Sequence, residues 1–203
     1  MSPARARLFL ALDLPERIRG RLAGWAREHV RPRPELRAVP PRNLHVTLCF
    51  LGWRDETDIE SLAQLALACA APVPDLSLRA AEWLPPRRPR VLAIDLRDGG
   101  GALDALQRRL VETLVARAGY RPEKRPFYPH VTIARVRAGA RVGARDRASL
   151  PPPPSAGTFA GPTLTLYRSR LARAGASYEP VARIGLQASS QPAPGCSTGG
   201  LHG

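Results

Sequence analysis

The sequence predicts an α+β protein whose chain is organised as two similar halves, rather than an alternating parallel βαβ fold. The main evidence is the tetrapeptide His45-Val46-Thr47-Leu48, which recurs almost unchanged as His130-Val131-Thr132-Ile133. The hydrophobic pattern reads as strand–helix–strand–helix–strand in the first half and strand–helix–strand–strand–strand in the second. The chain's 203 residues suffice for one substantial domain, and no apolar run approaches the roughly 20 residues that a membrane span needs.

The first half begins with a predicted strand at residues 7–13, whose apolar run is too short for a signal peptide. Pro15 can begin a helix, which we expect to extend to about residue 29 with an apolar face of Ile18, Leu22, Trp25 and Ala26. Prolines between residues 32 and 41 predict a loop that leads into the strand of His45. Residues 55–70 are expected to form a second helix with an acidic first turn and the apolar anchors Ile59, Leu62, Leu65 and Leu67.

The first half ends with a predicted strand at residues 76–84, and the second half begins with another at residues 90–96; a proline-rich turn joins the two. The glycines at 99–101 then open a third helix that ends near residue 118 and has an apolar side of Leu103, Leu106, Leu110 and Leu114. Three glycines could also suggest a phosphate loop, but the Walker lysine and hydroxyl pattern is absent. We therefore interpret these glycines as a turn.

The strand of His130 is followed by an arginine-, proline- and glycine-rich loop over residues 138–156. Residues 163–171 and 177–186 predict a hairpin around Ala174-Gly175. From residue 187 the chain is rich in serine, glycine and proline and has no core-forming residues, so we expect a disordered tail. The expected organisation is a single domain over residues 1–186 and a tail over 187–203.

The repeated tetrapeptide predicts that each half presents one imidazole beside one hydroxyl. Residues i and i+2 of a strand lie on the same face, so His45 shares a face with Thr47, and His130 shares one with Thr132. The apolar residues between them would then face the core. Two such pairs that face each other across a groove could perform acid–base catalysis.

An alternative interpretation is that these segments are two ordinary half-buried strands that happen to contain histidine. The recurrence of the tetrapeptide at matching places, each time after a polar or proline-rich approach, favours the functional interpretation. The chain has four histidines, and His29 at a helix end and His202 in the tail are given no catalytic role.

The composition favours a polyanionic partner. The net charge is +14, and phosphate contacts dominate nucleic-acid affinity. However, Lys124 is the one lysine among 31 basic residues, so part of the charge reflects the coding bias of a GC-rich genome. The three cysteines have neither zinc-site nor disulfide spacing, which is typical of a reducing cytoplasm.

Four segments in order resemble a known family: RLFLALDLP at 7–15, NLHVTLCFLG at 43–52, RPFYPHVTI at 125–133 and LTLYRS at 164–169. The chain is similar to the two-histidine phosphoesterases, and within them to the RNA 2′,3′-cyclic phosphodiesterases, historically called 2′-5′ RNA ligases (LigT-like). The resemblance extends from Arg7 to about Leu186. It implies a bilobal, pseudo-twofold α+β fold, in which antiparallel sheets line a central cleft and helices lie outside.

The resemblance also implies site residues and a reaction. His45 would donate a proton to the departing 3′ oxygen, and His130 would accept a proton from water, which leaves a 2′-phosphate. The nearly symmetric motifs alone do not order these two roles. Thr47 and Thr132 would donate hydrogen bonds to non-bridging phosphate oxygens. Arg135 would bind phosphate, although strict strand alternation points it away from His130, so this role requires a bulge or a strand end.

Four aromatic residues near the motifs are candidate stacking surfaces for a nucleobase: Phe50, Phe127, Tyr128 and Tyr167. Core packing is the expected role of at least two of them. No Asp/Glu/His cluster has metal-ligand spacing, so we expect neither a metal nor another cofactor. The expected partner is an RNA or oligonucleotide with a 2′,3′-cyclic phosphate end, acted on by a monomer away from membranes.

Two other functions remain open. The same histidines could join RNA ends through a 2′-5′ bond, because that reaction is the reverse chemistry. A non-catalytic RNA-binding module could also keep the fold, but binding alone does not require paired imidazoles.

Overall fold

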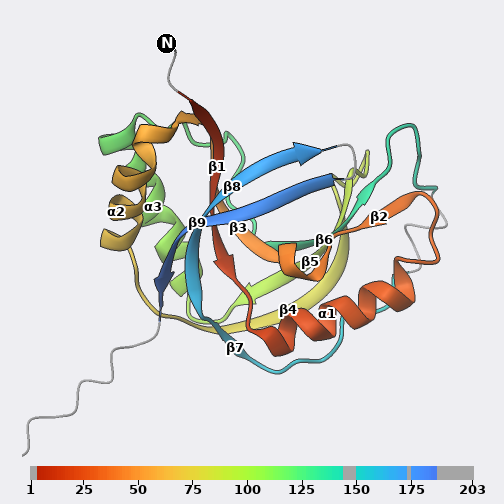
Figure 1. Ribbon diagram of the computed structural model, residues 1–203. Coiled ribbons are helices and arrows are strands. Elements are labelled where there is room, and N and C mark those ends of the chain that lie inside the picture. Colours follow the sequence, from red (N-terminus) through yellow and green to blue (C-terminus); the bar gives the residue numbers. More distant parts are fainter. Residues whose placement is uncertain (1–3, 144–149, 173–174, 187–203) are drawn as a thin grey trace, which may run out of the picture.

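The computed structural model describes residues 4–143, 150–172 and 175–186 and confirms the predicted α+β class (Figure 1). The α-helices within these ranges are α1 (Glu16–His29), α2 (Ile59–Ala68) and α3 (Ala102–Ala118). The strands are β1 (Arg5–Asp13), β2 (Leu36–Ala38), β3 (His45–Asp55), β4 (Val73–Leu84), β5 (Val91–Asp98), β6 (His130–Val136), β7 (Phe159–Gly161), β8 (Thr163–Ala172) and β9 (Gly175–Gly185). Short 3₁₀ turns, Pro41–Asn43 and Glu56–Asp58, flank β3.

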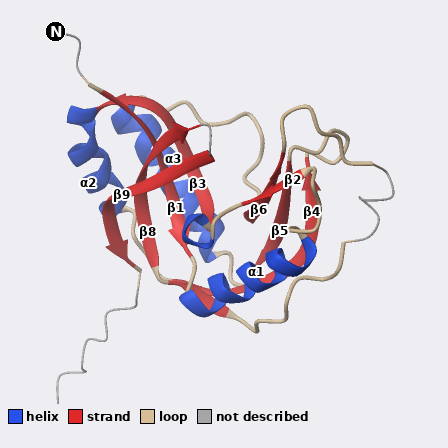
Figure 2. Cartoon of the chain, turned by 45° about the vertical axis from the view of Figure 1, so that its right-hand side comes forward, coloured by secondary structure: helices blue, strands red, loops and turns tan. Residues whose placement is uncertain are grey.

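The nine strands in the described residues form one antiparallel sheet in the order β7-β4-β5-β6-β3-β1-β8-β9, and β2 pairs with the C-terminal end of β6. The sheet curls strongly, with β4, β5 and β6 on one side and β1, β8 and β9 on the other (Figure 2). The two motif strands, β3 and β6, join these sides. They pair at one rung, Val46 opposite Val131, so the motifs meet where the two sides of the sheet meet. These sides differ from the predicted sequence halves, because β4 pairs with β5 and β8 pairs with β1.

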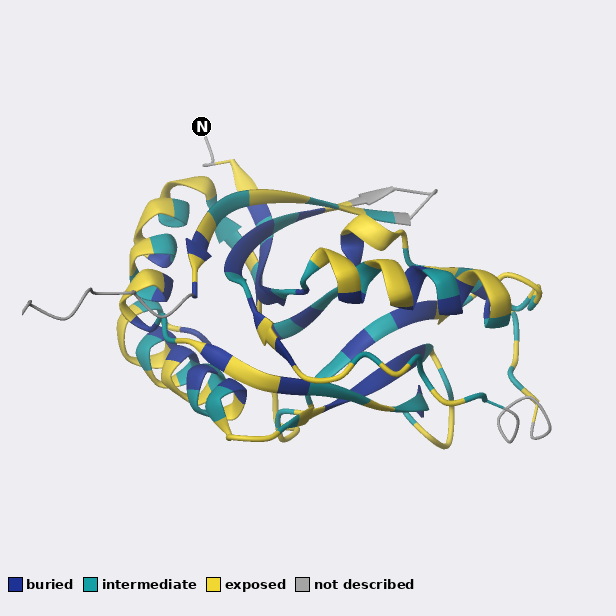
Figure 3. Cartoon of the chain, turned by 90° about the horizontal axis from the view of Figure 1, so that it is seen from below, coloured by how far each residue is buried: buried dark blue, intermediate teal, exposed yellow. Residues whose placement is uncertain are grey.

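The helices cover the outside of the curled sheet. Helix α1 packs against β6, whereas α2 packs against β9 and α3. Figure 3 shows that each helix buries the face toward the sheet and exposes the opposite face. The four leucines predicted for α3 are all buried, and left-handed glycines, Gly101 (φ 70°) and Gly119 (φ 55°), lie at the two ends of this helix.

Strand β1 is buried on both faces. Leu8, Leu10 and Leu12 belong to the main core, while Phe9 and Ala11 on the other face form a second cluster with Tyr167. This explains the unbroken apolar run of residues 8–12, which is typical of a central strand rather than of a half-exposed one.

The second helix differs from its prediction. It begins at Ile59 rather than at residue 55, because Asp55 pairs with Arg5 in the β1–β3 ladder. Its buried face consists of Leu62 and Ala66, and Leu67 is 53% exposed rather than an anchor. The prediction was therefore wrong about which residues face the core near the end of this helix.

Two short strands were not predicted. Strand β2 lies within the proline-rich segment that was expected to be a loop, and β7 precedes the predicted hairpin. Three residues are too few to carry a periodic signal. The hairpin itself is confirmed as β8 and β9, while the tail at 187–203 lies outside the described residues. Within the described part of the chain, no helix is long and apolar enough to cross a membrane.

Candidate active site

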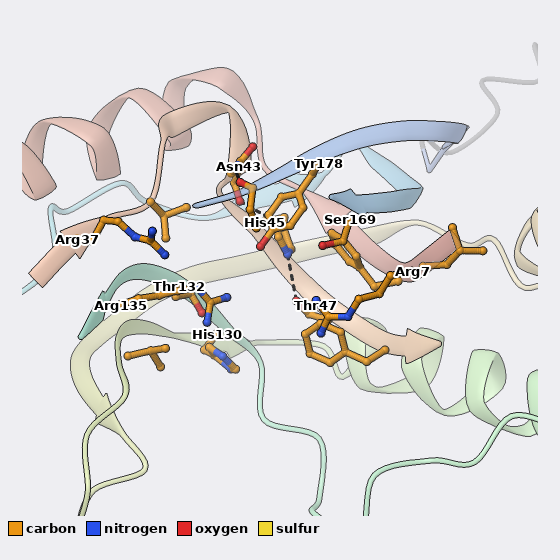
Figure 4. A pocket seen from close by; sticks show the side chains of 16 residues that line it. Arg7, Arg37, Asn43, His45, Thr47, His130, Thr132, Arg135, Ser169 and Tyr178 are labelled. Carbon is orange, nitrogen blue, oxygen red and sulfur yellow. Dashed lines mark hydrogen bonds between the residues drawn. The ribbon is translucent and has the colours of Figure 1, made fainter. Parts of the chain in front are cut away.

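The two motifs form the walls of one cleft of about 470 Å³ (Figure 4). The apolar motif residues Val46, Leu48, Val131 and Ile133 are buried in the core, as the strand parity predicts. The polar motif residues His45, Thr47, His130 and Thr132 are half-buried and line the cleft. The imidazoles of His45 and His130 lie on opposite walls.

Both imidazoles are held in the same way by the main chain. Nδ1 of His45 lies 2.7 Å from the carbonyl oxygen of Asn43, and Nδ1 of His130 lies 2.8 Å from that of Tyr128. A carbonyl oxygen only accepts, so Nδ1 carries the proton in each ring. In the neutral state each Nε2 therefore has a free lone pair, and Nε2 of His45 lies 3.1 Å from the Thr47 hydroxyl.

A β-bulge follows the threonine in both motif strands. In β6, Thr132 pairs with Ala93 and Ala134 pairs with Leu92, which leaves Ile133 as an extra residue. As a result Ile133 and Ala134 are both buried, and Arg135 lies on the same face as His130. The condition for Arg135 to reach the cleft is thus met.

The bulge in β3 lies at the same distance from its motif histidine as the bulge in β6. Thr47 pairs with Ala11 and Cys49 pairs with Leu10, so Leu48 is the extra residue. Leu48 and Cys49 are both buried, and Phe50, at the position that corresponds to Arg135, lies in the cleft and is 48% exposed. The two halves therefore place an aromatic ring and a guanidinium at equivalent positions.

The remaining predicted aromatic residues do not all reach the cleft. Phe127 and Tyr128 line an adjoining pocket of about 830 Å³, which shares His130 and Phe50 with the cleft. The ring of Tyr128 stacks on that of His130, with centroids 5.9 Å apart. The assignment of Tyr167 is corrected: its ring is 9% exposed, stacks on Phe9 and lies outside both pockets.

Several residues of the cleft were missed by the sequence analysis. Asn43 is buried and donates from Nδ2 to the carbonyl of Ala176 at 3.0 Å, which fixes the segment before His45. Tyr178 of β9 packs edge-on against His45 with ring centroids 5.3 Å apart. Asn43 could have been found from its place two residues before the histidine, whereas nothing in the pattern around Tyr178 singles it out.

The cleft is positively charged. Arg7, Arg37 and Arg135 line it, and no carboxylate is among the described residues that do so. Arg37 and Arg135 are opposite each other in the β2–β6 ladder, an arrangement of like charges that costs stability unless an anion is bound. Guanidinium groups are suited to phosphate, with which they form paired hydrogen bonds.

Burial lowers the pKa of His45 to about 4, and the positive charges of Arg135 and His130 act in the same direction. The Asn43 carbonyl and the Asp13 carboxylate oppose this shift. His45 is therefore neutral in the free protein at physiological pH. Among the described residues, no group of three or more His, Cys, Asp or Glu side chains could hold a metal ion.

The lowered pKa predicts how stability depends on pH. The folded protein binds fewer protons at His45 than the unfolded chain between pH 6.5 and about 4, so His45 lowers the stability as pH falls through this window. We expect the melting temperature to fall less between pH 6.5 and 4 in His45→Asn than in the unsubstituted protein. NMR titration of the His45 ring should give a midpoint near pH 4, and a midpoint near 6.5 would contradict the prediction.

A family model described as the 2′-5′ RNA ligase superfamily matches residues 14–179. A curated relative named RNA 2′,3′-cyclic phosphodiesterase, from Escherichia coli (strain K12), is 35% identical over 181 residues, which are 89% of this chain and 96% of that protein. A relative of the same name from Bacillus subtilis (strain 168) is 32% identical over 145 residues, 68% of this chain and 76% of that protein.

Solved structures have the same fold. The crystal structure of E. coli LigT complexed with 3′-AMP superposes with a TM-score of 0.74 at 32% identity and covers 91% of this chain and all of that one (100%). A crystal structure of a Thermus thermophilus protein has a TM-score of 0.68 at 30% identity, with coverage of 89% of this chain and 97% of that one.

Proposed function

The chain belongs to the 2′-5′ RNA ligase superfamily and hydrolyses RNA 2′,3′-cyclic phosphate ends, and we propose that it does so with His45 as proton donor and His130 as proton acceptor. The observation that carries the proposal is the presentation of two imidazoles, each with Nδ1 bound to the main chain, from opposite walls of one arginine-lined cleft. Such an arrangement can remove a proton on one side of phosphorus and supply one on the other.

In the proposed reaction, Nε2 of His130 takes a proton from water as its oxygen bonds to phosphorus. The bond between phosphorus and the 3′ oxygen breaks, and Nε2 of His45 protonates that oxygen. Water is consumed and the product is a 2′-phosphomonoester. Thr47 and Thr132 donate hydrogen bonds to the non-bridging oxygens, where negative charge grows, and Arg135 offsets that charge.

The donor role of His45 depends on the substrate. In the free cleft burial keeps His45 neutral above a pKa of about 4. The bound phosphate brings a negative charge beside the ring and raises this pKa, because a nearby opposite charge favours the charged form. Binding of the substrate thus prepares the acid that the reaction needs.

The test is incubation with an oligonucleotide that ends in a 2′,3′-cyclic phosphate, in the presence of EDTA. We expect turnover in chelator, because the proposed proton transfers use two imidazoles, and a phosphate retained on the 2′ hydroxyl. Loss of turnover in EDTA with rescue by one divalent metal, or a 3′-phosphate product, would contradict the mechanism. A bell-shaped dependence of turnover on pH is expected from one protonated and one neutral histidine.

Ligation through a 2′-5′ bond is a second candidate, favoured by the adjoining pocket beside His130. A nucleoside with a 5′ hydroxyl in this pocket could take the place of water and lose its proton to His130. A second arm of the assay, with an added 5′-hydroxyl oligonucleotide, distinguishes the two reactions by the length of the product.

We also propose that the protein acts on RNA as a monomer in a reducing cytoplasm. The buried thiols of Cys49 and Cys69 support the last point, since both are free.

A further inference from the structure

Each motif histidine has an aspartate directly opposite it on the neighbouring strand. Asp13 of β1 pairs with His45 of β3, and Asp95 of β5 pairs with His130 of β6. The two halves therefore repeat a histidine–aspartate rung as well as the tetrapeptide. Neither carboxylate lines the cleft, so neither can touch the substrate there.

Two buried hydroxyl groups fix the carboxylate of Asp13. The Thr165 hydroxyl donates to Oδ2 at 2.8 Å, and the Tyr167 hydroxyl donates to Oδ1 at 2.7 Å. Thr165 is 0% and Tyr167 is 9% exposed, so these donors hold the charge in place from the core side. Burial and the bond to Asp13 raise the pKa of Tyr167, which therefore remains a donor at all physiological pH values.

An aromatic layer fills the space around this rung. The ring of Phe9 lies 5.0 Å from that of His45 and stacks on Tyr167 at 5.2 Å, and Tyr178 covers another side of the imidazole. These rings surround the imidazole, so much of the medium around the rung of His45 and Asp13 is apolar. A charge acts more strongly across such a medium than across water.

The aspartate behind His130 has different surroundings. The Asp95 carboxylate is 4% exposed and lies 3.5 Å from Nε of Arg79. Burial raises the pKa of Asp95. Its charge is thus partly offset by a cation, whereas in the described part of the chain Asp13 forms no ion pair.

We propose that Asp13 is a positioning residue for the reaction: its charge, held by Thr165 and Tyr167, favours the imidazolium form of His45 against the burial that disfavours it, and so supports the role of His45 as proton donor. This inference rests on the proposed function and deepens it. The two motifs are nearly symmetric, whereas the surroundings of their two aspartates differ.

The other charged groups around His45 do not supply this effect. From β6, Arg135 and His130 lower the pKa of His45, while burial lowers it further. The Asn43 carbonyl raises it, and the Asp13 carboxylate is the side chain that acts in the same direction. The rings of Tyr167 and Tyr178 lie beside that of His45, and the charges of Arg183 of β9 and Arg19 of α1 act on Tyr167.

The experiment is an NMR titration of the His45 ring in the full, ligand-free chain, compared between the unsubstituted protein, Asp13→Asn and Asp75→Asn. Asp13→Asn removes the charge and keeps the shape. Asp75→Asn is the matched control, because it removes an equal charge that does not face His45, and asparagine tolerates its φ of 57°. We expect the pKa of His45 to fall in Asp13→Asn and to stay unchanged in the control.

A kinetic readout separates this role from a merely structural one. The acidic limb of kcat/KM should move to lower pH in Asp13→Asn, and turnover at neutral pH should fall by about tenfold for each unit by which the pKa drops. If Asp13→Asn does not fold, the same measurements are made on Asp13→Ser, which can still accept a hydrogen bond. An unchanged titration of His45, or a loss of activity that is equal at all pH values, would overturn the inference. Because the titration needs no turnover, failure of the proposed function is detected separately, as a lack of activity in the unsubstituted protein.

Discussion

Replacement of His45 or His130 with alanine is expected to reduce turnover by about 10² to 10⁴, the range for loss of one general acid or base. Both imidazoles line the cleft with Nε2 available for proton transfer, and neither belongs to the main core. Because they act in one reaction step, the double variant should be much less than multiplicatively worse. Single-turnover rates on a cyclic-phosphate oligonucleotide measure both effects.

The control for this prediction is His29→Ala. His29 packs against Trp25 on α1 and lies outside the cleft, so its loss should leave turnover nearly unchanged. Thermal melts of all variants should show that the cleft variants remain folded. Activity that persists without either histidine, or that falls only in step with stability, would mean that the motif strands serve the core alone.

The second large effect is expected at Arg135. Arg135→Met keeps the length of the side chain but removes the guanidinium that the bulge in β6 places in the cleft. We expect kcat/KM to fall by about 10²-fold, as for other losses of one donor to developing charge. The pKa of His45 should rise at the same time, since Arg135 lowers it in the free protein.

Arg97→Met provides the matched comparison, because Arg97 is exposed on β5 and lies outside both pockets. It removes the same charge and should leave kcat/KM almost unchanged. If both variants lose activity equally, Arg135 contributes only to the overall charge and does not act on the phosphate.

Much of the fold follows from local patterns in the sequence. The apolar faces of α1 and α3 and the strand parity of His45-x-Thr47 are set by residues close in the chain, and these elements form as predicted. The end of β3 cannot be predicted from local patterns, because Asp55 is held in the strand by its pairing with Arg5 rather than by its own strand propensity. Strand β2 exists for the same reason, through its pairing with β6.

In the site, too, some features follow from local sequence and others depend on the pairing of distant strands. The motif histidines can be identified from the tetrapeptides, but the bulge that turns Arg135 inward depends on the register with Leu92 and Ala93 of β5. The sequence suggested Tyr167 as a stacking surface because the few aromatic residues gather near the motifs. Its actual role depends on Asp13, which is remote in sequence and becomes a neighbour only through the β1–β8 pairing. Sequence periodicity does not reveal interactions that depend on the register between strands distant in the chain.

The attachment of both imidazoles to main-chain carbonyls has an evolutionary consequence. In a catalytic triad the orienting acceptor is a side chain, so one point mutation can remove it. Here the acceptors are the peptide oxygens of residues 43 and 128, which every amino acid supplies. The tautomer of both rings can thus stay the same while the surrounding residues diverge. A very short motif is therefore enough to preserve it during evolution.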